Sequence, residues 1–159
     1  MNPILVKQTA ILSAILGGIL GVLTLIPFVR GFAFMLLILC VSAVIIVYMK
    51  KNELIGIIDV KEGAILGAVI GFVSFIAFSI IFAPLAMLVG LILPKTYIGY
   101  LANFFKTLPF FIFVMLSIFG AILSALMNSF AGLVTAYGYE ALSGMKKESN
   151  ESVDFEIKE

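Results

Sequence analysis

Charged residues separate four long apolar runs along this chain of 159 residues. The charge-free runs cover residues 8–29, 31–49, 63–93 and 107–139. Each is close to or longer than the roughly 20 residues that a helix needs to cross a bilayer, and none shows the ~10-residue alternating segments of a transmembrane β-barrel. The pattern predicts an all-α, polytopic integral membrane protein with four transmembrane helices, over residues 8–29, 31–49, 60–83 (continuing to 93) and 108–138.

We expect these helices to form one transmembrane domain over residues 1–145, arranged as two helical hairpins. Pro27, Arg30 and Gly31 mark the turn of the first hairpin. The first apolar run exceeds the roughly 7–15-residue core of a signal peptide and shows no convincing cleavage site, so we interpret it as a retained helix. The charged segment 146–159 is predicted to be a disordered cytoplasmic tail.

The third run has recognisable residues at its start and at an internal break. Asp59 and Glu62 have the spacing of a helix N-cap and its N3 position, where carboxylates can accept hydrogen bonds from unpaired backbone N–H groups. Pro84 lacks a backbone donor, which kinks or ends the helix near Phe82. The apolar segment 85–93 is too short for another crossing, so it is a kinked continuation, a re-entrant piece or a surface segment.

Aromatic and apolar residues follow this run at helical spacing, between Lys95 and Lys106. These positions are Tyr97, Tyr100, Leu101, Phe104 and Phe105. Because amphipathic aromatic side chains favour the membrane–water boundary, we expect a short interfacial helix between the third and fourth transmembrane helices. An anchoring role explains this helix more simply than a platform for a substrate or partner does.

Small and polar residues recur at every fourth position in three of the runs, a spacing that places them on one helix face. The rows are Ser13, Gly17 and Gly21; Gly63, Gly67 and Gly71; and Gly120, Ser124 and Asn128. In lipid, such faces let two backbones pack closely, as in a glycine zipper. We expect the first row to face the second, since both helices leave the same side of the membrane. The alternative is that each row contacts the second or fourth helix.

The first and third runs also resemble each other internally. Five residues of the first run recur in the third at an offset of 54: Ala10, Ile11, Leu12, Ala14 and Gly17 match Ala64, Ile65, Leu66, Ala68 and Gly71. A duplicated helical hairpin would explain the similarity, and parallel repeats of this type occur in transporters. Low complexity is the alternative explanation, because the string AILSA recurs at residues 121–125.

Composition agrees with the membrane class and offers little for catalysis. Hydrophobic residues make up 63% of the chain, and the net charge of +1 gives no pull toward nucleic acid. With no histidine and a single cysteine, Cys40, we expect no catalytic residue, cofactor or metal site. Asn128 is the most polar side chain at predicted membrane depth. A hydrogen bond to a facing helix explains it more simply than a polar path does.

Two functions are compatible with these residues. The first is a small non-enzymatic membrane protein that packs in the lipid bilayer with itself or with another membrane protein. The alternative is a subunit of a small channel or transporter. It is supported by the internal similarity, the break at Pro84 and the polar Asn128.

Lysine and arginine are distributed unequally between the two predicted sides of the membrane. Three lie on one side, Arg30, Lys95 and Lys106, and the other seven on the opposite side, Lys7, Lys50, Lys51, Lys61, Lys146, Lys147 and Lys158. Positive residues concentrate in short cytoplasmic loops. We therefore expect a protein of the cell (inner or plasma) membrane with both termini in the cytoplasm.

Overall fold

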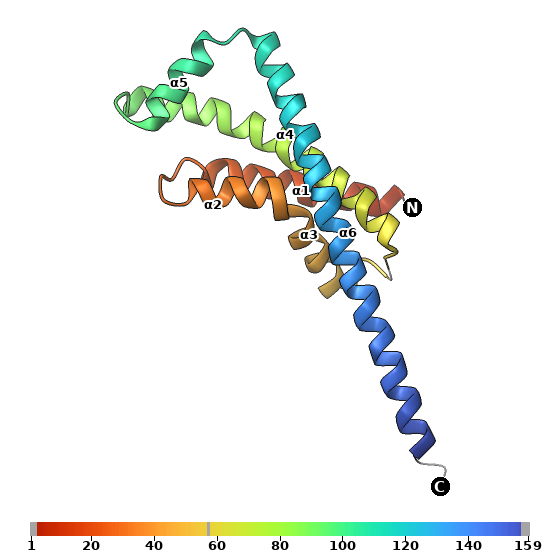
Figure 1. Ribbon diagram of the computed structural model, residues 1–159. Coiled ribbons are helices and arrows are strands. Elements are labelled where there is room, and N and C mark those ends of the chain that lie inside the picture. Colours follow the sequence, from red (N-terminus) through yellow and green to blue (C-terminus); the bar gives the residue numbers. More distant parts are fainter. Residues whose placement is uncertain (1–2, 57, 157–159) are drawn as a thin grey trace.

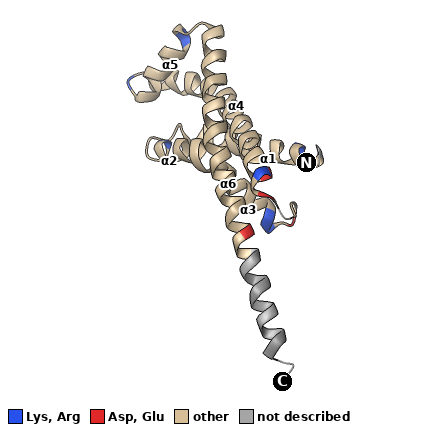
Figure 2. Cartoon of the chain, turned by 45° about the vertical axis from the view of Figure 1, so that its right-hand side comes forward, with Lys and Arg blue, Asp and Glu red and all other residues tan. Residues whose placement is uncertain are grey.

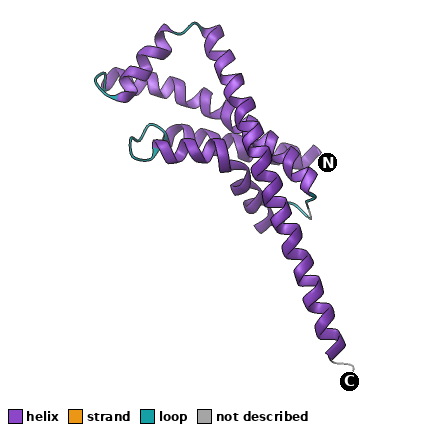
Figure 3. Ribbon diagram, in the orientation of Figure 1, coloured by secondary structure: helices purple, strands orange, loops and turns teal. Residues whose placement is uncertain are grey.

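Every regular element in the described part of the chain is a helix (Figures 1 and 3). The computed structural model describes residues 3–56 and 58–156, with side chains described for 4–56 and 58–142. Four helical segments are long and apolar enough to cross a membrane: Ile4–Leu23, Arg30–Lys51, Val60–Ile92 and Phe110–Leu142. The predicted all-α class and the four apolar helices are thereby confirmed.

The first helix, α1 (Pro3–Leu23), begins and ends earlier than the predicted range 8–29. A proline disfavours helical backbone in the residue before it, and Pro27 follows the end of α1 closely. The chain turns there through short-range hydrogen bonds, from Leu25 N to Val22 O (3.1 Å) and from Ile26 N to Leu23 O (3.0 Å). The last part of the first apolar run is therefore a turn.

The second apolar helix is broken in its middle, which we did not predict. It consists of α2 (Arg30–Met35), the π-helical turn η1 (Leu36–Cys40) and α3 (Val41–Lys51). At Cys40 the backbone leaves helical geometry, with φ −127° and ψ −4°, and α3 turns away from the direction of α2 (Figure 1). Such a kink is expected where a π turn interrupts the regular hydrogen-bond ladder of a helix.

The long helix α4 (Val60–Ile92) is central to the fold, since it contacts α1, α3, α5 and α6. The Asp59 side chain accepts a hydrogen bond from Val60 N (2.8 Å), so the predicted cap is present. Pro84 lies inside the helix, and the segment after it is a helical continuation. At ~1.5 Å per residue, the 33 residues of α4 outreach a hydrocarbon core of about 30 Å, so in a bilayer the helix must tilt or project.

The short helix α5 (Tyr97–Thr107) bridges the diverging ends of α4 and α6 (Figure 1). The Thr96 hydroxyl caps it by accepting a hydrogen bond from Gly99 N (3.4 Å). A helix was predicted over these residues, whereas its location at the membrane interface stays a prediction.

The last helix, α6 (Phe110–Glu156), begins directly after Pro109. Its backbone is helical as far as Glu156, whereas the sequence predicted a disordered tail from residue 146. Extending an existing helix requires no new nucleus, which favours continuation into the charged segment. Residues 157–159 of the predicted tail lie outside the described part of the chain.

The directions of the helices follow from which residues face each other. α1 runs parallel to α4, because Gly17 lies against Ser74 and Gly21 lies against Phe78. α6 runs antiparallel to α4, because Gly67 lies against Asn128 and Gly71 lies against the earlier residue Ser124. These directions are compatible with two helical hairpins, which themselves stay a prediction. A buried core joins α1, the second crossing and α4, and its fully buried members include Leu37, Val41, Ile46, Met49 and Ile70.

Candidate functional site

The most polar side chain of the apolar helices, Asn128 on α6, lies in a fully buried junction with the broken second helix. Its Oδ1 accepts a hydrogen bond from Ser42 N (2.9 Å). Its Nδ2 donates to Leu37 O (3.1 Å) and to Ile38 O (2.9 Å). The Ser42 hydroxyl in turn donates to the backbone carbonyl of Asn128 (2.8 Å). One amide side chain thus holds three backbone groups of the neighbouring helix.

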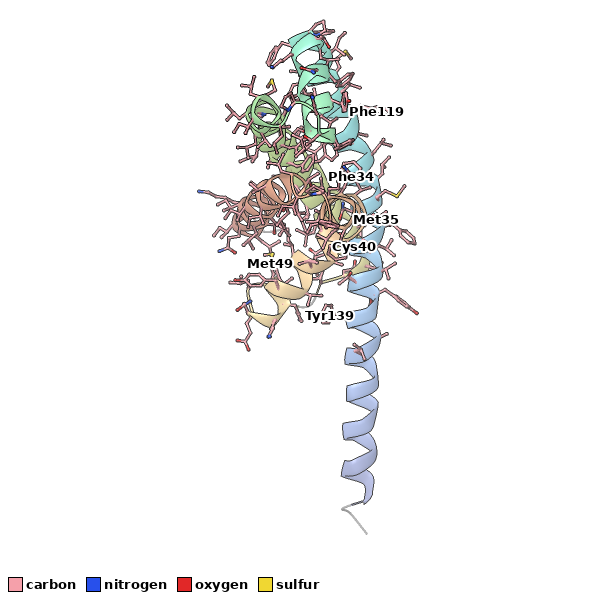
Figure 4. All side chains as sticks on the ribbon, turned by 90° about the vertical axis from the view of Figure 1, so that its left-hand side faces the viewer. Phe34, Met35, Cys40, Met49, Phe119 and Tyr139 are labelled. Atoms are coloured by element: carbon pink, nitrogen blue, oxygen red, sulfur yellow. The ribbon has the colours of Figure 1, made fainter. Side chains whose placement is uncertain are left out.

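These contacts explain how the second helix tolerates its break. In an uninterrupted α-helix, Ser42 N would donate to Ile38 O, four residues earlier. Here the amide of Asn128 stands between these two groups and bonds to both. Unpaired backbone groups are costly where water is absent, so the amide replaces the missing bond. The break lies at Cys40, which Figure 4 labels between Met35 and Met49 along this crossing.

Ser124, one turn before Asn128 on α6, completes the junction, which we name the Asn128 junction (Leu37, Ile38, Ser42, Ser124 and Asn128). The Ser124 hydroxyl donates to Leu37 O (3.3 Å), and Asn128 Nδ2 also lies near Ser124 O (3.0 Å). Among the described residues, no buried side-chain nitrogen or oxygen lacks a hydrogen-bond partner. The polar groups of the junction are therefore fully satisfied within the chain.

The glycine row of α4 faces the small-residue row of α6. A Cβ added to Gly67 would meet the backbone carbonyl of Asn128, and one added to Gly71 would meet that of Ser124. A Cβ on Gly132 would meet Gly63 O. Glycine is required at these positions because the two backbones touch there.

Gly120, the first residue of the α6 row, contacts a side chain and not a backbone. A Cβ at this position would meet the ring of Phe75 on α4. Gly120 therefore lies at the point where α4 and α6 begin to separate.

The row on α1 contacts a different face of α4. A Cβ on Gly17 would meet the backbone of Ser74, and Gly21 lies against the carbonyl of Phe78. The Ser74 hydroxyl donates to Ser13 O (3.1 Å). The prediction that Ser13, Gly17 and Gly21 face Gly63, Gly67 and Gly71 is wrong. The glycine face of α4 is occupied by α6, as the alternative for that row proposed.

Two residues of these contacts escaped the sequence analysis. Ser42 and Ser74 are single serines within apolar runs, where a hydroxyl commonly bonds to its own helix and indicates no partner. No local pattern marked the carbonyls of Leu37 and Ile38 as acceptors, because their availability depends on the π turn. The residue that could have indicated the junction was Asn128, whose amide requires several partners in an apolar setting.

The arrangement offers neutral amide and hydroxyl groups and no titratable side chain. Among the described residues, no group of three or more His, Cys, Asp or Glu side chains could hold a metal ion. Two adjoining apolar cavities of about 380 Å³ and about 160 Å³ lie between α4, α5 and α6, with Ser79 at both. With these groups, the Asn128 junction can fix the relative positions of α6, the broken second helix and α4.

Comparison with protein-family models, with curated proteins and with solved structures finds no match to this chain. The functional argument therefore rests on the residues and contacts described above.

Proposed function

We propose that this chain is a small, non-enzymatic integral membrane protein that packs in the bilayer against a second membrane protein, either another copy or a different partner. The observation that carries the proposal is the uncovered apolar surface of α6. In the 18-residue apolar stretch of each helix, only 11% of α6 is buried within the fold, against 44% of α4.

The exposed side chains of α6 are large and include several aromatic rings. Phe110, Phe119 and Phe130 are 80%, 61% and 69% exposed, and Phe119 is labelled on this helix in Figure 4. Rings of this size supply contact area at low cost in conformational entropy. Because lipid already covers apolar surface, it is the close packing of these rings against another helix, and not their burial, that favours α6 as the helix that meets a partner.

The use of polar groups inside the fold also supports a packing role. Side chains that could line a solute path, above all Asn128, Ser42 and Ser124, bond to one another and to backbone groups. Polar residues in membranes serve either transport or helix association. Full internal pairing favours association.

Cysteine crosslinking in native membranes tests the contact through α6. In a Cys40→Ala background, Phe119→Cys should give a discrete crosslinked product with a bifunctional thiol or thiol–amine reagent. A product of twice the chain mass indicates a second copy, and any other mass indicates a different partner.

The matched control is Ile19→Cys on α1, which is 49% exposed. Gly17 lies against Ser74 and Gly120 lies against Phe75, so positions 19 and 119 have similar depth along α4. We expect far less product from Ile19→Cys. Equal yields from both positions, or no product from either, would contradict a partner on α6.

A subunit of a small channel or transporter is the second candidate, favoured by the broken second helix. Discontinuous helices at mid-membrane form the substrate sites of many transporters. Flux measurements on the purified chain in liposomes test this candidate. Saturable flux of a small ion or metabolite that Asn128→Leu abolishes would favour transport over packing.

A further inference from the structure

One end of the helical bundle carries Arg30, Lys95 and Lys106. No acidic residue is close to these three cations in the sequence. All nine acidic residues of the chain lie within 53–62 and 140–159. Figure 2 shows the separation, with blue but no red around the start of α2 and around α5. An anion that reaches this end meets three positive charges and no carboxylate of the described residues.

A cavity of about 310 Å³ opens at this end, between the turn that joins α1 to α2 and the turn that joins α4 to α5. Its walls are mainly apolar and include Leu25, Val89 and Leu93. Arg30, the first residue of α2, and Tyr97, the first residue of α5, also line it. The cavity therefore combines an apolar interior with one cationic side chain.

Arg30 is held in a defined position by the Tyr97 ring. The guanidinium carbon lies 4.2 Å from the ring centroid, a cation–π contact. A guanidinium in such a contact can still donate its N–H groups to a planar or tetrahedral oxyanion. Among the described residues, no hydrogen-bond or carboxylate partner of the Arg30 guanidinium is present.

We propose that this cavity binds an anionic phospholipid, with the lipid phosphodiester on Arg30 and the adjoining glycerol and first methylenes on the apolar walls. Arginine binds phosphate through paired N–H donors, and the absence of acids at this end removes repulsion. The apolar walls favour a lipid over a soluble phosphate. The inference rests on the membrane setting of the proposed function but not on a partner at α6.

Native mass spectrometry of the detergent-solubilised full chain tests the site. The protein is exposed to equal amounts of dioleoyl phosphatidylglycerol and dioleoyl phosphatidylcholine, and the ratio of the two lipid-bound species is measured. Both lipids carry a phosphodiester, but the choline ammonium of phosphatidylcholine cancels its net charge and is repelled by Arg30. We therefore expect wild-type protein to prefer the anionic lipid on the order of tenfold. Arg30→Gln should bring the ratio close to one.

Lys106→Gln is the matched control, because it removes one positive charge from the same end without touching the cavity. It should keep most of the wild-type preference. Arg30→Lys retains the charge but loses the forked guanidinium donor, so an intermediate ratio is expected. Because each ratio compares two lipids on the same protein sample, a change in overall stability does not mimic the effect, and the Lys variant gives a result if the Gln variant folds poorly.

Several outcomes would overturn the proposal. Equal binding of both lipids by wild-type protein, or an unchanged preference in Arg30→Gln, would remove Arg30 from lipid recognition. If Lys106→Gln lowered the preference for the anionic lipid as much as Arg30→Gln does, the preference would come from the summed positive charge of this end and not from the cavity. Competition by inorganic phosphate or glycerol phosphate at concentrations that match the lipid would identify a site for soluble anions instead. None of these results depends on whether Phe119→Cys crosslinks, so the two proposals fail independently.

Discussion

At the scale of single residues, Asn128 has the largest consequences for this fold. Its amide bonds to Ser42 N, Leu37 O and Ile38 O, and its own carbonyl accepts from the Ser42 hydroxyl. Without these contacts the broken second helix would bury unpaired backbone groups. The break in the second helix therefore depends on the hydrogen bonds of Asn128.

Replacement of Asn128 by leucine should destabilise the protein. The leucine has the same branched shape but leaves Ile38 O and the Ser42 N–H without their partner, and Leu37 O with only the Ser124 hydroxyl. We expect a loss of about 2 kcal/mol in unfolding free energy, since membrane hydrogen bonds are modest but unsatisfied buried groups are costly. The measurement is the thermal unfolding of purified protein in detergent.

Thr135→Val on the same helix is the control for this change. The Thr135 hydroxyl bonds only to Ala131 O of its own helix (2.7 Å), so its removal should have little effect. If Asn128→Leu were as stable as wild type, the amide would not support the break in the second helix.

At the scale of elements, α4 organises the bundle through two different faces. Its glycine face contacts α6, whereas the face around Ser74 and Phe78 contacts α1. Helix association in membranes depends on such close backbone contacts, because burial from lipid gives no hydrophobic driving force. α4 can therefore hold two neighbours through close backbone contacts.

Two adjacent glycines of α1 provide a test of its contact with α4. A Cβ on Gly17 would meet the Ser74 backbone, whereas one on Gly18 would lie 3.5 Å from the flexible end of Ile81. Gly17→Ala should therefore force the helices apart and cost about 1–3 kcal/mol, as overpacking does. Gly18→Ala should be neutral or stabilising, since alanine favours helix by up to ~1 kcal/mol. Thermal unfolding of the two variants compares them directly, and equal melting temperatures would refute the contact.

The contact between α4 and α6 is tested in the same way with Gly67→Ala. The added methyl group would meet the Asn128 carbonyl, so the variant should lose stability by about 1–3 kcal/mol. Gly138→Ala on α6 is the control, because no atom lies within 4 Å of its added Cβ. A Gly67 variant with wild-type stability would place the glycine row against lipid.

At the scale of the whole molecule, charge lies at the ends of the helical bundle and not between them (Figure 2). Because α1 and α4 are parallel and α6 is antiparallel to α4, the bias of seven cations against three assigns one end to the cytoplasm. We propose on this basis that both termini are cytoplasmic.

Reporter fusions test this topology. Green fluorescent protein fused after Glu159 should fluoresce, and alkaline phosphatase at the same position should be inactive, since each works on one side of the membrane only. Phosphatase inserted after Lys95 should be active. The reverse pattern would invert the assignment of both ends.

The sequence by itself determined the class, the number of apolar helices and several local features. Apolar length and charge are summed over neighbouring residues, so four long charge-free runs suffice to predict four helices. The cap at Asp59 and the helix Tyr97–Thr107 were predictable for the same reason, since their signals lie within one or two turns. The rows of small residues likewise marked Gly67 and Asn128 as packing positions before any partner was known.

Only the tertiary structure decided which faces meet and where the second helix breaks. The helices are apolar on most sides, so no face was marked as inward, and α4 meets a different neighbour with each of two faces. The π turn Leu36–Cys40 is as apolar as its surroundings and gives no local signal. Its stabilising partner, Asn128, lies 86 residues beyond Ser42, and only folding brings that amide to the backbone groups that the break leaves unpaired.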